Sequence, residues 1–80
     1  MRLPRDLSGS DLARALRVYG YVVTRQSGSH LRLSTQQNGE HHVTIPAHAH
    51  LRVGTLAAIL AEVARHLGIE RSVLAARLFS

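Results

Sequence analysis

Histidine is the residue type of this chain best suited to proton transfer, and six histidines occur in 80 residues. The unperturbed imidazole pKa of about 6.5 lets the protonated and neutral forms coexist near neutral pH. One of them, His30, directly follows Gly28-Ser29, a pair typical of a tight turn. Glycine at position 28 also permits a close approach of the backbone to a ligand. His30 is therefore the first candidate for a catalytic or ligand-binding group.

The charge of the chain favours an anionic partner. Ten arginines, no lysines and five acidic residues give a formal net charge of +5. A GC-rich coding bias explains an arginine-only usage, yet guanidinium forks also suit phosphate better than ammonium does. A basic small domain favours a polyanion or an acidic protein. The total charge alone does not decide between them, because nucleic-acid binding requires a focused patch.

The absence of cysteine excludes disulfides, thiolate metal sites and a cysteine nucleophile. No apolar run approaches the roughly 20 residues that span a bilayer, so no membrane association is expected. The N-terminus, residues 1–6, lacks the apolar stretch of a signal peptide, which predicts a cytoplasmic protein. No repeat or long linker divides the chain. We therefore expect a single domain over residues 1–80.

Three helices are expected from apolar spacing and from end signals. The first spans about residues 9–19, with Ser8 as its N-cap in a capping box and Ser10 as the alternative cap. The second has Thr55 as its expected N-cap and carries a strong apolar stripe. A shorter third helix is expected over residues 69–79. The expected apolar positions are Leu12, Leu16, Tyr19, Leu56, Ile59, Leu60, Val63, Leu67, Val73, Leu74 and Leu78.

Three strands are expected between the first and second helices. β-Branched and aromatic residues predict a strand over residues 21–26. Polar–apolar alternation predicts two more, over residues 30–34 and 42–45. An Asn38-Gly39 turn signal lies in the hairpin loop between these two strands. Pro46 ends the third strand because proline has no N–H for the ladder.

The predicted fold is therefore α+β, with the order α-β-β-β-α-α and the helices on one face of a three-stranded antiparallel sheet. So short a chain cannot cover both faces of this sheet. The residues expected to face the helices are Leu31, Leu33, Val43 and Ile45. The residues expected on the open face are His30, Arg32, Ser34, His42 and Thr44.

Hairpin pairing places His30 near the loop that follows the third strand. If Leu33 pairs with Val43, His30 lies opposite Pro46, whereas a register shifted by two residues sets it opposite Thr44. In both registers, His30 lies at the hairpin end from which a histidine-bearing loop leaves.

Four sequence pieces occur in a fixed order: Gly20-Tyr21, Gly28-Ser29-His30, Val43-Thr44-Ile45-Pro46-x-His48 and Gly54-Thr55-Leu56-x-x-Ile59-Leu60. In this order and at this spacing they resemble the HicA family of bacterial toxins. The resemblance covers roughly residues 8–60. It implies a double-stranded-RNA-binding-domain-like fold, an mRNA endonuclease activity and neutralisation by a HicB-like antitoxin.

The resemblance also implies that His30 is the catalytic residue. Metal-free RNA cleavage uses the 2′-hydroxyl as nucleophile and needs a base, an acid and positive charge near the phosphate. His48 is the first candidate for the second acid or base or for a phosphate contact, and capping of local backbone is an equal alternative. Arg32, beside His30, is a candidate phosphate ligand. Arg52 is the nearest substitute for a lysine that the family often has in this loop.

The remaining polar residues have simpler interpretations. Ser29 either closes the turn, which we favour, or donates to a phosphate. His42 is interpreted as a surface residue on the open face that contacts RNA, and His66 as a surface or helix-dipole residue. A metal site built from His48-x-His50 and His41-His42 is not expected, because no cysteine or carboxylate cluster completes a ligand set. No cofactor is expected.

Two other functions remain compatible with the sequence. The first is a non-catalytic RNA-binding module of the same fold, which would bind RNA by shape through phosphate and 2′-hydroxyl contacts. The second is a protein-interaction subunit with an acidic partner.

Overall fold

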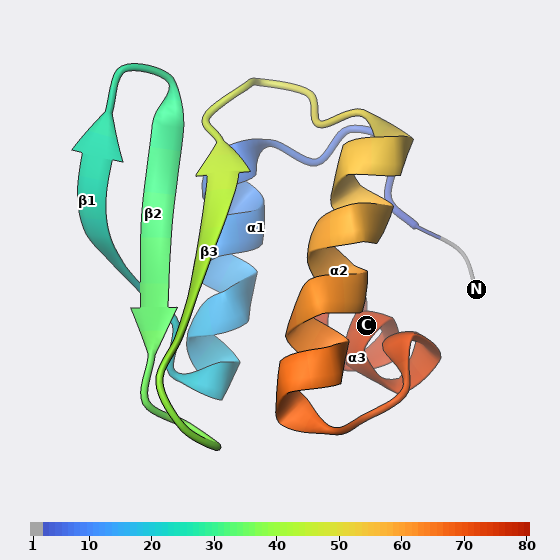
Figure 1. Ribbon diagram of the computed structural model, residues 1–80. Helices are drawn as coiled ribbons and strands as arrows, with labels where there is room; N and C mark the ends of the chain where they lie inside the picture. Colours follow the sequence, from blue (N-terminus) through green and yellow to red (C-terminus); the bar gives the residue numbers. More distant parts are fainter. Residues whose placement is uncertain (1–2) are drawn as a thin grey trace.

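A computed structural model describes residues 3–80 of the chain; Met1 and Arg2, part of the N-terminal stretch considered above, lie outside the described residues. The order of elements is that expected from the sequence, and the fold is α+β (Figure 1). The helical elements are α1 (Gly9–Ala15), the 3₁₀ helix η1 (Leu16–Tyr19), α2 (Val53–Leu67) and α3 (Arg71–Phe79). The strands are β1 (Val22–Ser27), β2 (His30–Thr35) and β3 (His41–Pro46).

The start of α1 is fixed by its cap and by the loop after β3. The Ser8 hydroxyl accepts a hydrogen bond from the Asp11 N–H at 3.0 Å, and the Asp11 carboxylate accepts one from the Ser8 N–H, which confirms the capping box. The Gly9 N–H donates to the carbonyl of His48 at 2.9 Å. A Cβ on Gly9 would lie 2.0 Å from the Pro46 carbonyl oxygen, so only glycine allows this close approach.

The sheet has the strand order β1-β2-β3, with both pairs antiparallel. Leu33 pairs with Val43, and His30 pairs with Pro46. This is the first of the two registers that the sequence allows. The helix α1 lies behind β2 and β3, and α2 runs beside β3 (Figure 1). The opposite face of the sheet, here called the open face, has no helix over it in the part of the chain that the structure describes (Figure 1).

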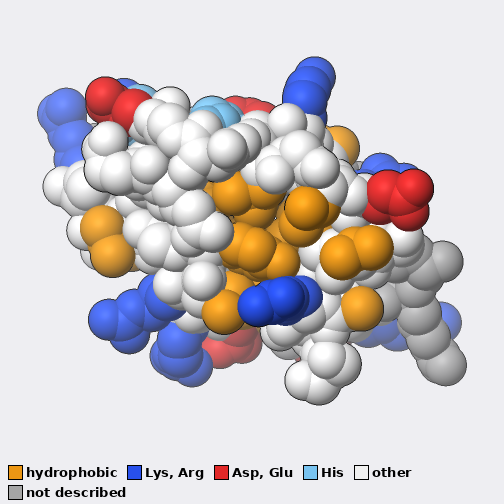
Figure 2. Space-filling model, turned by 90° about the horizontal axis from the view of Figure 1, so that it is seen from below, with side chains coloured by type: hydrophobic (Ala, Val, Ile, Leu, Met, Phe, Trp, Pro, Cys, Tyr) orange, Lys and Arg blue, Asp and Glu red, His pale blue; other side chains and the backbone are white. Residues whose placement is uncertain are grey.

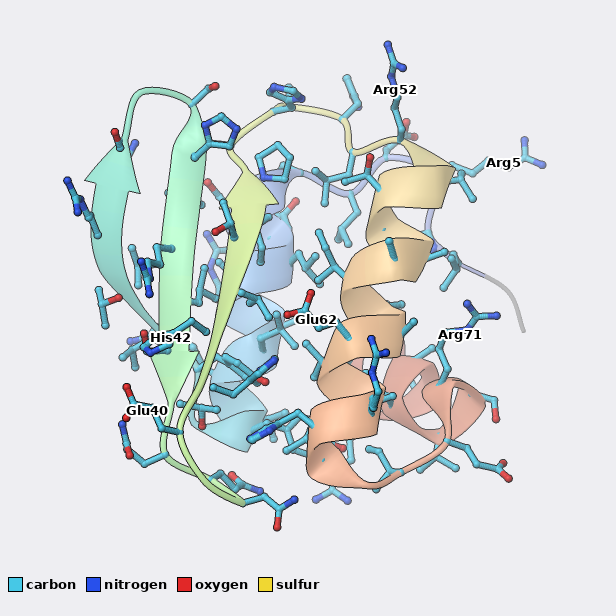
Figure 3. The ribbon with its side chains drawn as sticks, viewed as in Figure 1. Arg5, Glu40, His42, Arg52, Glu62 and Arg71 are labelled. Atoms are coloured by element: carbon cyan, nitrogen blue, oxygen red, sulfur yellow. The ribbon has the colours of Figure 1, made fainter. Side chains whose placement is uncertain are left out.

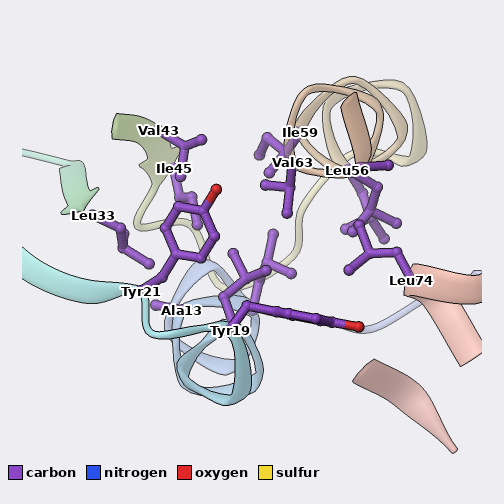
Figure 4. Close-up of a cluster of buried hydrophobic side chains, with 14 of the residues drawn as sticks. Ala13, Tyr19, Tyr21, Leu33, Val43, Ile45, Leu56, Ile59, Val63 and Leu74 are labelled. Carbon is purple, nitrogen blue, oxygen red and sulfur yellow. The ribbon is translucent and has the colours of Figure 1, made fainter. Parts of the chain in front are cut away.

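The core fills the space between the inner face of the sheet, α1 and α2 (Figure 4). It contains the four expected sheet residues and most of the expected helix residues. Val73 is an exception: 52% of its side chain is exposed, because Leu74 and Ala75 supply the buried side of α3. The buried hydrophobic side chains are Leu12, Ala13, Leu16, Tyr19, Tyr21, Leu31, Leu33, Val43, Ile45, Leu51, Leu56, Ile59, Leu60, Val63, Ala64, Leu74 and Ala75.

The expected cap of α2 was wrong. The helix begins at Val53 and has Arg52 as its N-cap, without a side-chain capping hydrogen bond. The Leu56 N–H donates to the Arg52 carbonyl at 2.9 Å, which closes a turn that already contains Thr55. The apolar stripe begins at Leu56, but the backbone enters the helix almost one turn earlier.

Hydrophobic side chains also reach the surface at the end of the molecule opposite the β1–β2 turn (Figure 2). At this end η1 meets α3, and the Arg77 guanidinium lies 5.8 Å from the centroid of the Tyr19 ring, a cation–π distance. Among residues 3–80, no helix has the length and apolar character needed to cross a membrane.

Candidate functional site

The two-residue turn Gly28-Ser29 positions His30. Ser27 pairs with His30 across this turn, Gly28 has a φ of 56° and Ser29 has a negative φ. A two-residue hairpin turn with a positive φ only at its first residue is the type II′ turn, which requires glycine there. No atom lies within 4 Å of the place where a Cβ of Gly28 would be, so the backbone is open to an approaching molecule.

The turn is fixed to the exit of β3. The Ala47 N–H donates to the carbonyl of Ser29 at 2.6 Å. The carbonyl of the next residue, His48, accepts a hydrogen bond from the Gly9 N–H at the start of α1. These two hydrogen bonds connect the turn, the loop after β3 and the first helix. The backbone of His48 therefore lies close to that of His30, and its carbonyl, not its side chain, accepts the hydrogen bond from the start of α1.

The side chains of His30 and His48 are both exposed. In the part of the chain that the structure describes, neither imidazole forms a hydrogen bond or an ion pair with another residue. His50 differs, since its Nδ1 lies 3.8 Å from a carboxylate oxygen of Asp6. The two rings nearest the turn are thus available to an external group.

Arg32 lies two residues after His30 on β2 and, as expected, on the open face. Arg52 lies at the start of α2, where its side chain points away from the sheet in Figure 3. The structure therefore brings Gly28, Ser29, His30 and Arg32 together with the backbone of His48, but not Arg52.

Arg25 is a further open-face residue that strand alternation did not predict. The pairing of β1 with β2 shifts between Val23, which lies opposite Leu33, and Arg25, which lies opposite Arg32. Thr24 is the extra residue of this β-bulge. With regular alternation, Arg25 would share the inner face with Val23; the bulge turns it to the open face.

His42 belongs to a separate chain of hydrogen bonds at the other end of the open face (Figure 3). Its Nδ1 contacts the Ser34 hydroxyl at 2.5 Å, and its Nε2 lies 2.8 Å from the Glu40 carboxylate. Ser34 is four residues from His30 along β2, or about 13 Å at the usual rise of a strand. Both ring nitrogens of His42 thus have protein partners, and the ring is too far from His30 to act on the same phosphate.

A second histidine cluster lies on the inner side of β3. The Tyr21 hydroxyl is 2.7 Å from Nδ1 of His41, whose Nε2 is 3.3 Å from the Glu62 carboxylate. The His66 ring stacks on His41 with centroids 4.3 Å apart. Nε2 of His66 lies 3.0 Å from the carbonyls of Gln37 and Gly39, so the ring N–H is on Nε2 and donates to both carbonyls. His66 is therefore part of this cluster and not a free surface residue.

Burial raises the pKa of Tyr21 to about 12, and the Glu62 carboxylate acts in the same direction. Burial and the neighbouring His66 lower the pKa of His41, against the opposing effect of Glu62. A neutral His41 then accepts from the Tyr21 hydroxyl at Nδ1 and directs its Nε2–H to Glu62. Strand alternation gives the signal for this cluster, because His41 has the same parity as the core residue Val43.

A groove separates α1 from the inner side of β1. Its lining combines residues of α1 and η1, among them Arg14 and Arg17, with residues of and next to the sheet, and none of the predicted site residues takes part. The lining residues are Ser10, Ala13, Arg14, Arg17, Tyr21, Val22, Val23, Gln26 and Leu31. The groove and the His30 region are therefore different surfaces. The described residues contain no group of three or more histidine, cysteine or acidic side chains placed to hold a metal ion.

Comparison with known proteins identifies the family. The family model described as "HicA toxin of bacterial toxin-antitoxin" matches residues 9–69, from the first residue of α1 to just beyond α2. Neither the curated proteins nor the solved structures gave a match. The matched segment includes all three strands and the turn before His30, whereas α3 lies outside it. The chain belongs to the HicA family of toxins of bacterial toxin–antitoxin systems.

Proposed function

We propose that this toxin is a metal-independent endoribonuclease that cleaves mRNA in the cytoplasm, with residues 1–80 acting as one domain. The observation that carries the proposal is the position of His30. Its exposed imidazole lies at the end of an uncovered sheet face, immediately after a turn with open space beside Gly28. An RNA backbone can approach this position without displacing any described element.

The proposed reaction uses only groups that RNA and the protein supply. The 2′-hydroxyl attacks the adjacent phosphorus as a base removes its proton, and the bond to the 5′-oxygen breaks as an acid protonates that oxygen. The products are a 2′,3′-cyclic phosphate and a 5′-hydroxyl. His30 performs one of these two proton transfers.

His48 is the proposed partner of His30 in proton transfer or a ligand of the scissile phosphate. The hydrogen bond between Ala47 and Ser29 supports this assignment, because it holds the loop beside the turn. Gly28 allows the phosphate to approach, Ser29 supplies a donor to its oxygens, and Arg32 binds the RNA backbone beside it. Arg52 would contact RNA only if the RNA strand extends along the loop between β3 and α2.

We further propose that a HicB-like antitoxin inactivates the toxin by covering the open face around His30. Family membership implies an antitoxin partner, and the charge of the surface supports an acidic partner segment. Such a segment would compete directly with RNA for this surface.

The test replaces His30 with alanine and compares growth arrest on expression with RNA cleavage by the purified protein. His50→Ala is the matched control, since His50 is an exposed loop histidine whose ring faces Asp6. The expected result is loss of both activities in His30→Ala and retention of both in His50→Ala. A folded His30→Ala protein with full activity would exclude His30 as the catalytic residue.

A non-catalytic RNA-binding module is the second candidate function. It is favoured by the fact that no described side chain orients the rings of His30 and His48, whereas catalytic histidines usually have an orienting partner. Binding of RNA without cleavage, with enzyme in excess over substrate, would identify this function.

A further inference from the structure

The cross-strand pair of Arg25 and Arg32 is an unusual arrangement for a protein surface. The two residues lie directly opposite each other on β1 and β2, and both side chains are exposed on the open face. Like charges directly opposite in an antiparallel pair are destabilising. An arrangement that costs stability needs either a compensating carboxylate or a ligand.

No described carboxylate compensates the pair. Four of the five acids contact other residues: Asp6 faces His50, Asp11 faces Arg14, and Glu40 and Glu62 face His42 and His41. The fifth, Glu70, is at the N-cap of α3, which packs mainly against α2. Among the described residues, no salt bridge joins Arg25 or Arg32 to a carboxylate, so the pair is available to an anion.

The bulge that creates the pair is held by specific hydrogen bonds. The Thr24 hydroxyl donates to the Arg32 carbonyl at 3.3 Å and lies 3.2 Å from the Ser34 hydroxyl. These contacts fix Thr24 on the open face as the extra residue, which places Arg25 there too. The backbone of the two strands therefore holds Arg25 directly opposite Arg32.

The distance between the arginine pair and His30 indicates which phosphate the pair can bind. Arg32 is two residues from His30, about 7 Å along β2 at the usual strand rise. That separation places the arginines beside the reacting phosphate and not on it. The open face carries no tyrosine or phenylalanine for base stacking, because Tyr19 and Tyr21 are buried in the core and Phe79 packs against it from α3. The aromatic rings of the open face are the imidazoles of His30 and His42, so binding of an RNA strand on this face relies chiefly on phosphate contacts.

We propose that Arg25 and Arg32 form a two-arginine clamp that binds a phosphate of single-stranded RNA next to the phosphate cleaved at His30. The inference rests on the proposed function. It adds Arg25 to the site and assigns RNA binding and proton transfer to different residues. The clamp supplies affinity for the RNA strand, whereas proton transfer belongs to the histidines. Two guanidinium forks satisfy the oxygens of one phosphate and remove the repulsion between the arginines.

The test measures the affinity for a short single-stranded RNA whose 2′-hydroxyls are methylated, which removes the internal nucleophile. Variants Arg25→Gln and Arg25→Lys are compared with Arg71→Gln, an exposed arginine at the start of α3, far from the sheet (Figure 3). We expect Arg25→Gln to weaken binding roughly tenfold. The plot of log affinity against log salt concentration has a negative slope, and the loss of one charge should reduce the magnitude of this slope by about 0.7. Arg25→Lys should weaken binding less and keep the slope, and Arg71→Gln should change neither.

Cleavage of unmodified RNA provides the second readout. With enzyme in excess over RNA and at a concentration that saturates binding, Arg25→Gln should cleave at the wild-type rate, with the loss confined to subsaturating enzyme concentrations. Wild-type affinity and salt slope in Arg25→Gln would overturn the clamp, as would a reduced rate at saturation. If the wild-type protein binds the methylated RNA through Arg25 but does not cleave RNA, the clamp stands and the proposed catalytic function fails. If the wild-type protein binds no RNA, both fail.

Discussion

The hydroxyl of Tyr21 lies 2.7 Å from Nδ1 of His41 and joins the residue before β1 to the first residue of β3. Both residues are inside the protein, Tyr21 fully and His41 in part, and neither residue belongs to the open face. Through Glu62 and His66 the same cluster reaches α2 and the 36–40 loop. It therefore fixes the end of the sheet that lies opposite His30.

Tyr21→Phe should lower the free energy of unfolding by about 1–2 kcal/mol, because it leaves Nδ1 of His41 without its donor. Urea denaturation measures this change. Tyr19→Phe is the matched control, since no side-chain hydrogen bond of its hydroxyl occurs within residues 3–80, and it should change stability little. Equal effects of the two substitutions would contradict the structural role of the Tyr21–His41 contact.

The free energy of unfolding should decrease as the pH falls, because the pKa of His41 is lowered in the folded protein. Near pH 6.5 the unfolded chain therefore binds more protons than the folded protein. The resulting contribution is present above pH 6.5 and is lost as the pH falls towards the lower folded pKa. Denaturation curves across this range should show a weaker pH dependence for His41→Gln than for the wild type. An identical pH dependence would exclude this contribution.

On the alkaline side, Tyr21 should have the opposite effect. Its pKa rises from 10.0 to about 12 on folding, so the folded protein retains a proton that the unfolded chain loses. Its contribution is complete below pH 10 and is lost as the pH rises from 10 towards 12. The difference in stability between the wild type and Tyr21→Phe should therefore shrink in this range. A constant difference would contradict the raised pKa.

Gly28→Ala should cost about 1–2 kcal/mol of stability, because an L-residue at a φ of 56° is strained although space is available for the methyl group. Gly54→Ala in the first turn of α2 also meets no atom within 4 Å, but its backbone is helical, so it should raise stability by up to about 1 kcal/mol. Thermal unfolding of both variants separates backbone strain from lack of space. A stabilising Gly28→Ala would contradict the type II′ turn.

Much of the site follows from the sequence. Alternation of Leu31 and Leu33 with their polar neighbours is enough to place His30 and Arg32 on the open face. Alternation leaves two registers open, because a shift of two residues keeps the same face buried. In the structure Leu33 lies opposite Val43, which places His30 opposite Pro46. Local propensity and one-sided burial agree along this hairpin, and the prediction succeeds for that reason.

Other features depend on contacts that no local pattern encodes. The β-bulge at Thr24 depends on hydrogen bonds to β2, so regular alternation assigns Arg25 to the wrong face. The start of α2 is set by the backbone of Arg52 and not by the side chain of Thr55. His66 is held by carbonyls of a loop about 27 residues earlier in the chain, which helix periodicity alone cannot show.

The chemical nature of the cleavage ends shows whether the 2′-hydroxyl is the nucleophile and whether His30 takes part in the reaction. Purified wild-type protein and His30→Ala are incubated with RNA in excess chelator, and the new ends are identified by mass spectrometry. We expect 2′,3′-cyclic phosphate and 5′-hydroxyl ends from the wild type and no cleavage by His30→Ala. Ends with a 3′-hydroxyl and a 5′-phosphate, or undiminished cleavage by a folded His30→Ala protein, would contradict this mechanism.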